Sequence, residues 1–203
     1  MSKIFLFILI VLLNACASHG VVKYDFSSPN PKKGLVFFSV VERGFLNSSL
    51  GNDVKVQYRK LGSEKIAKIP NSLFGGPIMN NLIGDVTHFE GDELGKVYLM
   101  ELEPGDYEFI NWSIVTGNQY ATYSYQNPRL VSYRFRVESG NVKYIGSLGV
   151  EYYHVENLLG TEILGGGEFF YEDMAERDIE AAIKKYPNLD FSKVSISLFN
   201  SEI

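Results

Sequence analysis

The residues that most often carry chemistry are few in this chain and stand far apart. Among 203 residues there are three histidines, His19, His88 and His154, and one cysteine, Cys16. No HExxH motif and no pair of cysteines is present, so the spacing that zinc sites need is missing. His88 lies in the acidic segment DVTHFEGDE, which lacks the DxDxDG spacing of calcium loops. The sequence therefore predicts no metal site and no cofactor.

Hydrolytic chemistry has little support from the motifs. Neither GxSxG nor SxxK, the patterns that commonly present a serine nucleophile, occurs. Acids such as Glu151 and Glu156 could serve a glycosidase, but sequence spacing does not give the separation in space that this chemistry needs. The triplet Gly165-Gly166-Gly167 is followed by no Lys-Ser/Thr, so it is interpreted as a flexible turn and not as a phosphate loop.

A cluster of tyrosines gives the most suggestive surface feature. The segment from Tyr120 to Tyr125 reads YATYSYQN with the two residues that follow it, and aromatic rings among small polar residues suit stacking on sugars or gripping a peptide. Tyr123 and Tyr125 would share one face of a strand. Tyrosines at alternate strand positions more often cover a sandwich core, with the hydroxyl at the rim. Tyr120, Tyr123 and Tyr125 are therefore a candidate ligand site, with a core role as the alternative.

The body of the chain alternates apolar and polar residues in short segments bounded by turn residues, which is typical of an antiparallel sandwich or barrel. We expect hairpins where a Pro-Gly-Asp turn and a Ser-Gly-Asn turn separate two such segments. Gly146 and Gly149 indicate bulges or close packing. The expected strands and hairpins are Gly34–Glu42, Asp53–Lys60, the pair Lys96–Glu103 and Tyr107–Ile114, and the pair Arg129–Val137 and Val142–Tyr153.

The period changes near the end of the chain. From Glu172 to Tyr186 the apolar residues recur at helical spacing, and Pro187 ends the pattern. Acids stand in the first turn and Lys184 and Lys185 in the last, as the helix dipole favours. This predicts one amphipathic helix, followed by a closing strand over Lys193–Phe199. The expected buried face of the helix comprises Ala175, Ile179, Ala182, Ile183 and Tyr186.

Composition limits both the architecture and the partners. A chain of 203 residues with 45% hydrophobic and 21% charged residues can bury one sizeable core but hardly two, so we expect one folded domain. The net charge is -5, and Lys and Arg occur singly or in pairs such as Lys32-Lys33. Nucleic-acid binding would need a basic stripe, so no nucleic-acid partner is predicted.

The first residues form an export signal. Lys3 precedes an unbroken apolar run of ten residues, Ile4–Leu13, whereas a membrane-spanning helix needs about 20. A short basic region followed by such a run is typical of a signal peptide. An ordinary secretory signal and an uncleaved anchor are alternatives to the interpretation that follows.

The run ends in Leu13-Asn14-Ala15-Cys16, which resembles the lipobox of bacterial lipoproteins. The resemblance implies cleavage between Ala15 and Cys16, diacylglycerol on the Cys16 thiol and a further acyl chain, such as palmitate, on the new amino group. Several acyl chains make a firm anchor, because each buried methylene contributes about 0.8 kcal/mol. Ala17, where retention at the inner membrane would favour Asp, implies the outer membrane, facing the periplasm.

The segments LEPGDYEF and YRFRVESGNVKYIGSL resemble the transthyretin-like β-sandwiches of the PEGA type, which recur in bacterial envelope lipoproteins of unknown role. This resemblance covers about residues 96–150 and carries over no functional residue. The predicted fold is mainly β, an antiparallel β-sandwich with one C-terminal amphipathic helix and a closing strand. Residues 1–15 are the signal peptide, 16–33 the lipidated cysteine and a flexible tether, and 34–203 the domain.

These expectations define a function class without a ligand. The sequence predicts a lipid-anchored bacterial envelope protein whose domain is a non-enzymatic binding or scaffolding module for an envelope protein or a glycan. An envelope hydrolase is the alternative. The two differ in what the fold must show: a module needs an exposed strand edge or an apolar-aromatic patch, and a hydrolase needs a cleft with converging titratable groups.

Overall fold

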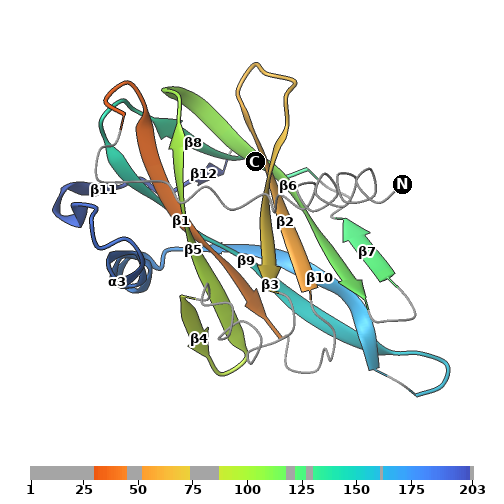
Figure 1. The fold of residues 1–203 in the computed structure, drawn as a ribbon. Coiled ribbons are helices and arrows are strands. Elements are labelled where there is room, and N and C mark those ends of the chain that lie inside the picture. Colours follow the sequence, from red (N-terminus) through yellow and green to blue (C-terminus); the bar gives the residue numbers. More distant parts are fainter. Residues whose placement is uncertain are drawn as a thin grey trace, which may run out of the picture.

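In the part of the chain that the structure describes, two β-sheets pack face to face, and helix α3 lies on the outer face of the first sheet (Figure 1). The computed structural model describes residues 30–44, 52–73, 87–117, 122–126, 130–160 and 162–201. Its elements are β1 Gly34–Arg43, β2 Asn52–Lys60, β3 Ala67–Leu73, β4 His88–Glu90, β5 Glu93–Leu102, β6 Gly105–Gly117, β7 Thr122–Gln126, β8 Tyr133–Val137, β9 Val142–Glu156, β10 Glu162–Glu172, α3 Ala175–Lys185, the short 3-10 helix η2 Phe191–Lys193, β11 Val194–Ile196 and β12 Asn200–Ser201.

The first sheet has the order β10-β9-β1-β5-β4, with β11 beside β9, and the second has the order β12-β8-β6-β2-β3, with β7 beside β6. The prediction of a mainly β fold with two sheets and one helix is confirmed. The sheets are not purely antiparallel, however, because β9 runs parallel to both β1 and β11. The chain enters β1 and β9 at the same end of the first sheet. There the backbone N–H of Gly140 donates to the Lys33 carbonyl, and that of Leu35 donates to the Asn141 carbonyl.

Both expected hairpins are wrong. β5 pairs with β1 and β4, whereas β6 pairs with β2, β7 and β8, so the turn at Pro104-Gly105 carries the chain from one sheet to the other. The turn at 138–141 does the same, because β8 belongs to the second sheet and β9 to the first. Turn residues reverse the chain locally, with positive φ at Gly105 and Gly140. They do not determine which strand becomes the hydrogen-bonded neighbour.

The main core lies between the sheets. Alternate residues of β1 point into it, since Val36, Phe38 and Val40 are buried there, as the period of two requires. Facing them from the second sheet are Phe109 and Trp112. Many of the aromatic rings pack in tilted or edge-on pairs, such as Phe38 with Phe109 at 5.3 Å between ring centroids, a geometry that aromatic quadrupoles favour.

Helix α3 covers a second, smaller core. Phe37 and Tyr144, on the outer face of the first sheet, pack with Ala182. Most of the predicted helix face is confirmed, but Ile183 is 48% exposed because it lies at the margin of the contact with the sheet. The predicted pair of Glu180 and Lys184 is present, with 2.7 Å between carboxylate and ammonium. The Lys185 ammonium donates to the Val97 carbonyl, which fastens the end of the helix to β5.

The glycines of β9 have the predicted packing roles. The register between β1 and β9 shifts near Gly146, whose φ is +118°, as expected at a bulge. A Cβ on Gly149 would lie 1.9 Å from the ring of Phe170, so that ring occupies the place of a side chain. The triplet 165–167 was predicted wrongly as a turn, since it lies within β10.

The expected closing strand over Lys193–Phe199 is divided into two pieces. β11 extends the first sheet beside the start of β9, with Val194 opposite Val142, and β12 pairs with β8 in the second sheet. Phe199, between the two pieces, is buried in the main core and is 5.2 Å from the ring of Phe109. Burial of this ring explains why the chain changes sheet here.

Candidate functional site

A pocket of about 470 Å³ opens at the side of the sandwich where β10, an edge strand of the first sheet, faces β6. Apolar and aromatic side chains dominate its wall, which is typical of ligand pockets, and its volume lies within their usual range. The lining residues are Trp112, Leu130, Val131, Tyr153, Gly167, Glu168 and Phe169.

The glycine triplet of β10 makes room for Tyr153. The register between β9 and β10 shifts between Leu164 and Gly166. A Cβ on Gly166 would lie 2.4 Å from the Tyr153 hydroxyl oxygen, and a Cβ on Gly165 would lie 3.0 Å from the same ring. Any larger residue at these two positions would therefore displace the tyrosine. The triplet lets Tyr153 lie over β10 while remaining 49% exposed.

Trp112 forms the inner wall of the pocket. Its ring stacks on Phe169 at 5.9 Å and contacts Tyr125 at 5.6 Å between centroids. The indole Nε1 is buried and has no hydrogen-bond acceptor among the residues that the structure describes. A buried indole N–H usually has a partner, but because Nε1 is closed to solvent, the contribution of Trp112 to the pocket is its ring and not its N–H.

Only one residue of the predicted tyrosine site contacts this pocket. Tyr125 is half-buried on β7, opposite Ile114 of β6, and contacts Trp112 from behind the pocket wall. Tyr123 lies on the same strand, opposite Thr116. Tyr120 lies outside the described residues, as do Ala15, Cys16 and the rest of the signal and lipobox. Sequence reasoning missed Trp112, Tyr153 and Phe169.

A second group of polar side chains gathers beneath α3 and is closed to solvent. The Asp178 carboxylate accepts hydrogen bonds from the Ser39 hydroxyl at 2.6 Å and from the Tyr144 hydroxyl at 2.8 Å. The Ser39 hydroxyl also lies 2.7 Å from that of Ser147. The Arg177 guanidinium contacts Asp178 at 2.8 Å and Glu93 at 2.6 Å.

This cluster holds the helix on the sheet. Ser39, Ser147 and Asp178 are each 1% exposed, so a substrate could not reach their hydroxyl or carboxylate groups. Burial, followed by the Asp178 carboxylate, raises the pKa of the Tyr144 hydroxyl far above its usual value. The hydroxyl therefore stays a donor at every physiological pH. The arrangement is structural and not catalytic.

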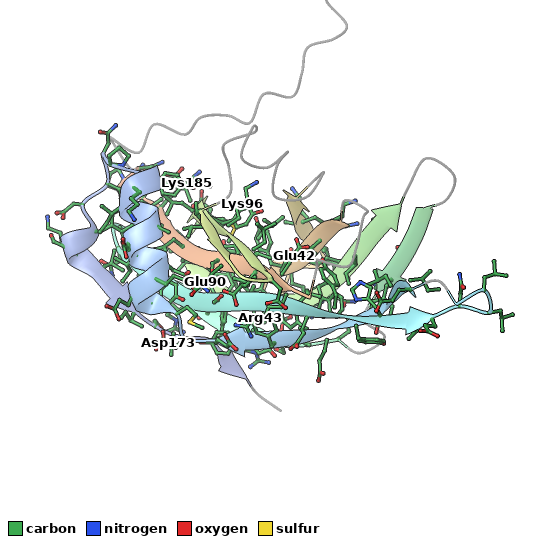
Figure 2. All side chains as sticks on the ribbon, turned by 90° about the horizontal axis from the view of Figure 1, so that it is seen from below. Glu42, Arg43, Glu90, Lys96, Asp173 and Lys185 are labelled. Carbon is green, nitrogen blue, oxygen red and sulfur yellow. The ribbon has the colours of Figure 1, made fainter. Side chains whose placement is uncertain are left out.

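Further along the same face, Arg43 connects three strands. Its guanidinium binds Glu93 of β5 at 2.6 Å and both carboxylate oxygens of Glu172, and it lies 4.2 Å above the Phe170 ring. In Figure 2, Arg43 lies away from α3; Lys185 is at one end of the helix and Asp173 is just before the other. The hydrogen bond with Arg43 lowers the pKa of Glu172.

The pKa of Glu172 is lower in the folded protein than its ordinary value of 4.5 in the unfolded chain. Glu172 therefore stabilises the fold at pH values above 4.5, and this contribution is lost as the pH falls through the lower pKa of the folded state. We expect Glu172→Gln to lower the free energy of unfolding by about 1 kcal/mol at pH 7, since the pair is partly exposed. Urea titrations at pH 7 and pH 3 should show this gap closing in acid. A gap of equal size at both pH values would contradict the role of the Arg43 pair, and Glu180→Gln, at an exposed pair, serves as the control.

Described residues offer no group of three His, Cys, Asp or Glu that could hold a metal ion. His154 is half-buried, and its Nε2 has no hydrogen-bond partner within the described part of the chain. The backbone of His88 lies in β4, paired with Gly95. No helix in the described ranges is long and apolar enough to cross a membrane.

No known protein family matches the sequence, and no curated protein matches it. A leucine-rich repeat protein from Bacteroides thetaiotaomicron, known from its crystal structure, is similar over 59% of this chain and 14% of its own, with 13% identity and a TM-score of 0.37. This chain thus covers about a seventh of that protein. So distant a similarity carries no information about function, and the candidate site rests on its own geometry.

Proposed function

We propose that this protein is a lipid-anchored bacterial envelope protein whose β domain is a non-enzymatic binding or scaffolding module for an envelope glycan or an envelope protein. The basic and apolar start of the chain and the segment Leu13-Asn14-Ala15-Cys16 support the anchor. The lipid would be carried on Cys16, and Ala17 favours the outer membrane, facing the periplasm. Membrane lipid is then the first partner, and nucleic acid is not one.

The observation that carries the binding function is the aromatic pocket beside β10. Trp112, Tyr153 and Phe169 offer ring surfaces, and the Tyr153 hydroxyl and the Glu168 carboxylate offer polar contacts. Rings combined with a few polar groups suit a sugar ring or an aromatic side chain of an extended peptide.

The same pocket gives no support to the alternative of a hydrolase. Glu168 is the one carboxylate among its lining residues, whereas glycoside hydrolysis uses two carboxyl groups placed across the scissile bond. The hydroxyl and carboxylate groups that do converge, around Asp178, are closed off beneath α3. A binding function needs neither a second acid nor a nucleophile.

Trp112 is the only tryptophan in the chain, so its fluorescence reports directly on the pocket. We expect a disaccharide-peptide fragment of the bacterial cell wall, or an extended peptide rich in aromatic residues, to change this emission in a saturable manner. Titration of the full-length protein with each probe tests the proposal. If both probes leave the emission unchanged, the pocket does not serve the proposed function.

Tyr153→Ala should weaken binding of the effective probe roughly fivefold, because one ring contact contributes about 1 kcal/mol. The fold should be preserved, since Tyr153 is half exposed. Ile66→Ala, at an exposed apolar side chain away from the pocket lining, is the matched control. Equal affinities for wild type and Tyr153→Ala would remove this residue from the binding surface.

A further inference from the structure

The turn between β9 and β10 exposes two leucines. Leu158 has a relative exposure of 105% and Leu159 of 88%. Within residues 157–160 of this turn, the backbone N–H of Gly160 donates to the Asn157 carbonyl and that of Leu159 donates to the Asn157 side chain, at 3.0 and 2.9 Å. The hairpin extends beyond the other strands in both views (Figures 1 and 2). Exposed apolar side chains on a projecting turn indicate a docking element.

Only acidic charges accompany these leucines. The sequence has no Lys or Arg between Lys143 and Arg177. Glu156 and Glu162 flank the tip and lie directly opposite each other in the strand register. Like charges in that position repel, and a basic partner would relieve the repulsion. We name Leu158, Leu159, Glu156 and Glu162 the acidic leucine tip.

A pocket of matching character lies at the opposite end of the sandwich. It has a volume of about 340 Å³, and its wall combines three apolar side chains with a serine, an aspartate and two arginines. The Arg136 side chain is 66% exposed and pairs with Asp106 at 2.7 Å, so its charge is accessible to a further carboxylate. We name this the basic end pocket, and its lining residues are Leu61, Asp106, Arg134, Phe135, Arg136, Ser197 and Leu198.

The strand topology places the two surfaces far apart. β8, which carries the arginines, ends at Val137, and the turn after it leads into β9 at Val142. β9 then runs 15 residues to Glu156 beside the tip, on the order of 45 Å. A single molecule therefore cannot place its own tip in its own pocket.

We propose that the acidic leucine tip of one molecule docks in the basic end pocket of a second copy of this chain, so that copies associate head to tail. The leucines would contact the apolar side chains of the wall, and the flanking glutamates would face the arginines. Two different surfaces at opposite ends form a heterologous contact, which repeats from copy to copy into a chain or a ring. The contact area is small, so each contact is weak and transient.

This inference goes beyond the proposed function and does not depend on it. Attachment of many copies to one membrane would raise their effective concentration and strengthen a weak contact, but the two surfaces exist without the lipid. An anionic lipid surface is the other conceivable occupant of the tip, and its phosphates would repel the flanking glutamates.

Crosslinking between two full-length chains in one cell tests the proposal. One chain carries Leu158→Cys and the other carries Ser197→Cys, each with its own epitope tag, and a short bifunctional maleimide is added to intact cells. We expect a mixed dimer from this pair. The matched control replaces Ser197→Cys by Ser192→Cys, which is exposed but outside the pocket. Pairing each cysteine variant with the wild-type chain accounts for any reaction at Cys16.

Charge reversal provides the second arm of this experiment. Glu156→Arg with Glu162→Arg in the tip chain should lower the yield of mixed dimer roughly fivefold, and Arg136→Glu in the pocket chain should restore it. Thermal unfolding of each purified variant confirms that the fold is intact. Equal yields for Ser197→Cys and Ser192→Cys would overturn the proposal. Protection of Leu158→Cys from a small maleimide without any tip-to-pocket product would assign the tip to lipid or to another protein, and would also overturn it.

Discussion

Asp178→Asn is expected to lower the free energy of unfolding by about 3–5 kcal/mol, the usual cost of breaking a buried ion pair. The carboxylate accepts from the Ser39 and Tyr144 hydroxyls and pairs with Arg177. An amide cannot balance the guanidinium, and if its oxygen accepts from both hydroxyls in place of Oδ2, its NH2 group faces the Arg177 N–H donors in place of Oδ1. Chemical denaturation of the wild type and the variant measures the difference.

Glu176→Gln is the matched control, because this acid stands in the same first turn of α3 but is exposed. Its effect should be within a few tenths of 1 kcal/mol, as for most surface changes. If Asp178→Asn does not fold, Ser147→Ala, which removes one member of the cluster, should still unfold at a lower denaturant concentration than Glu176→Gln. Equal stability of the wild type and all three variants would show that the cluster does not hold the helix.

The second large effect is expected from Cys16→Ser. Without the thiol no diacylglycerol can be attached. We therefore expect no mature, acylated protein in the membrane fraction of cells that express the variant. Several acyl chains make attachment effectively permanent, whereas a bare chain has only a weak affinity for the bilayer. Fractionation of cells followed by immunoblotting measures the distribution.

Ser18→Ala, two residues further along, is the control that should leave the protein in the membrane fraction. Retention of both variants in a form that detergent alone releases would point to the uncleaved apolar run as the anchor. Recovery of both variants and of the wild type in the soluble fraction would contradict lipid attachment altogether.

The sequence patterns predicted which segments form strands and the helix better than they predicted which strands pair with each other. β1, β2 and α3 follow from periods of 2 and 3.6 residues, which depend on neighbours close in the chain. The hairpins failed because the turns after β5 and β8 lead into strands of the opposite sheet. That choice depends on which faces bury Phe38, Phe109 and Trp112 together, and these positions are far apart in sequence.

The sequence pattern could have shown that α3 carries a buried acid. Asp178 is three residues after Ala175 and four before Ala182, which places it on the apolar face of the predicted helix. An acid in such a position needs partners. Its partners Ser39 and Tyr144 belong to strands 139 and 34 residues away in the chain, so the pattern could indicate that partners exist but not which residues they are.

Sequence analysis missed the candidate pocket because the glycine triplet beside it has the composition of a turn. Three consecutive glycines commonly mark loops, but in β10 the first two leave space for the Tyr153 ring and the third lies against Val150 and Ile114. The predicted site around Tyr125 was near the pocket because β7 pairs with β6, the strand that carries Trp112. Only the packing of β10 over β6 brings these aromatic residues together.

The most direct test of the lipid-anchored module is the intact mass of the protein purified from the membrane fraction of cells that express the unaltered chain. The account predicts a chain that begins at Cys16, contains the remaining 188 of 203 residues and is heavier by a diacylglycerol group and a further acyl chain. A protein that begins at any other residue, or that begins at Cys16 without added lipid, would contradict it.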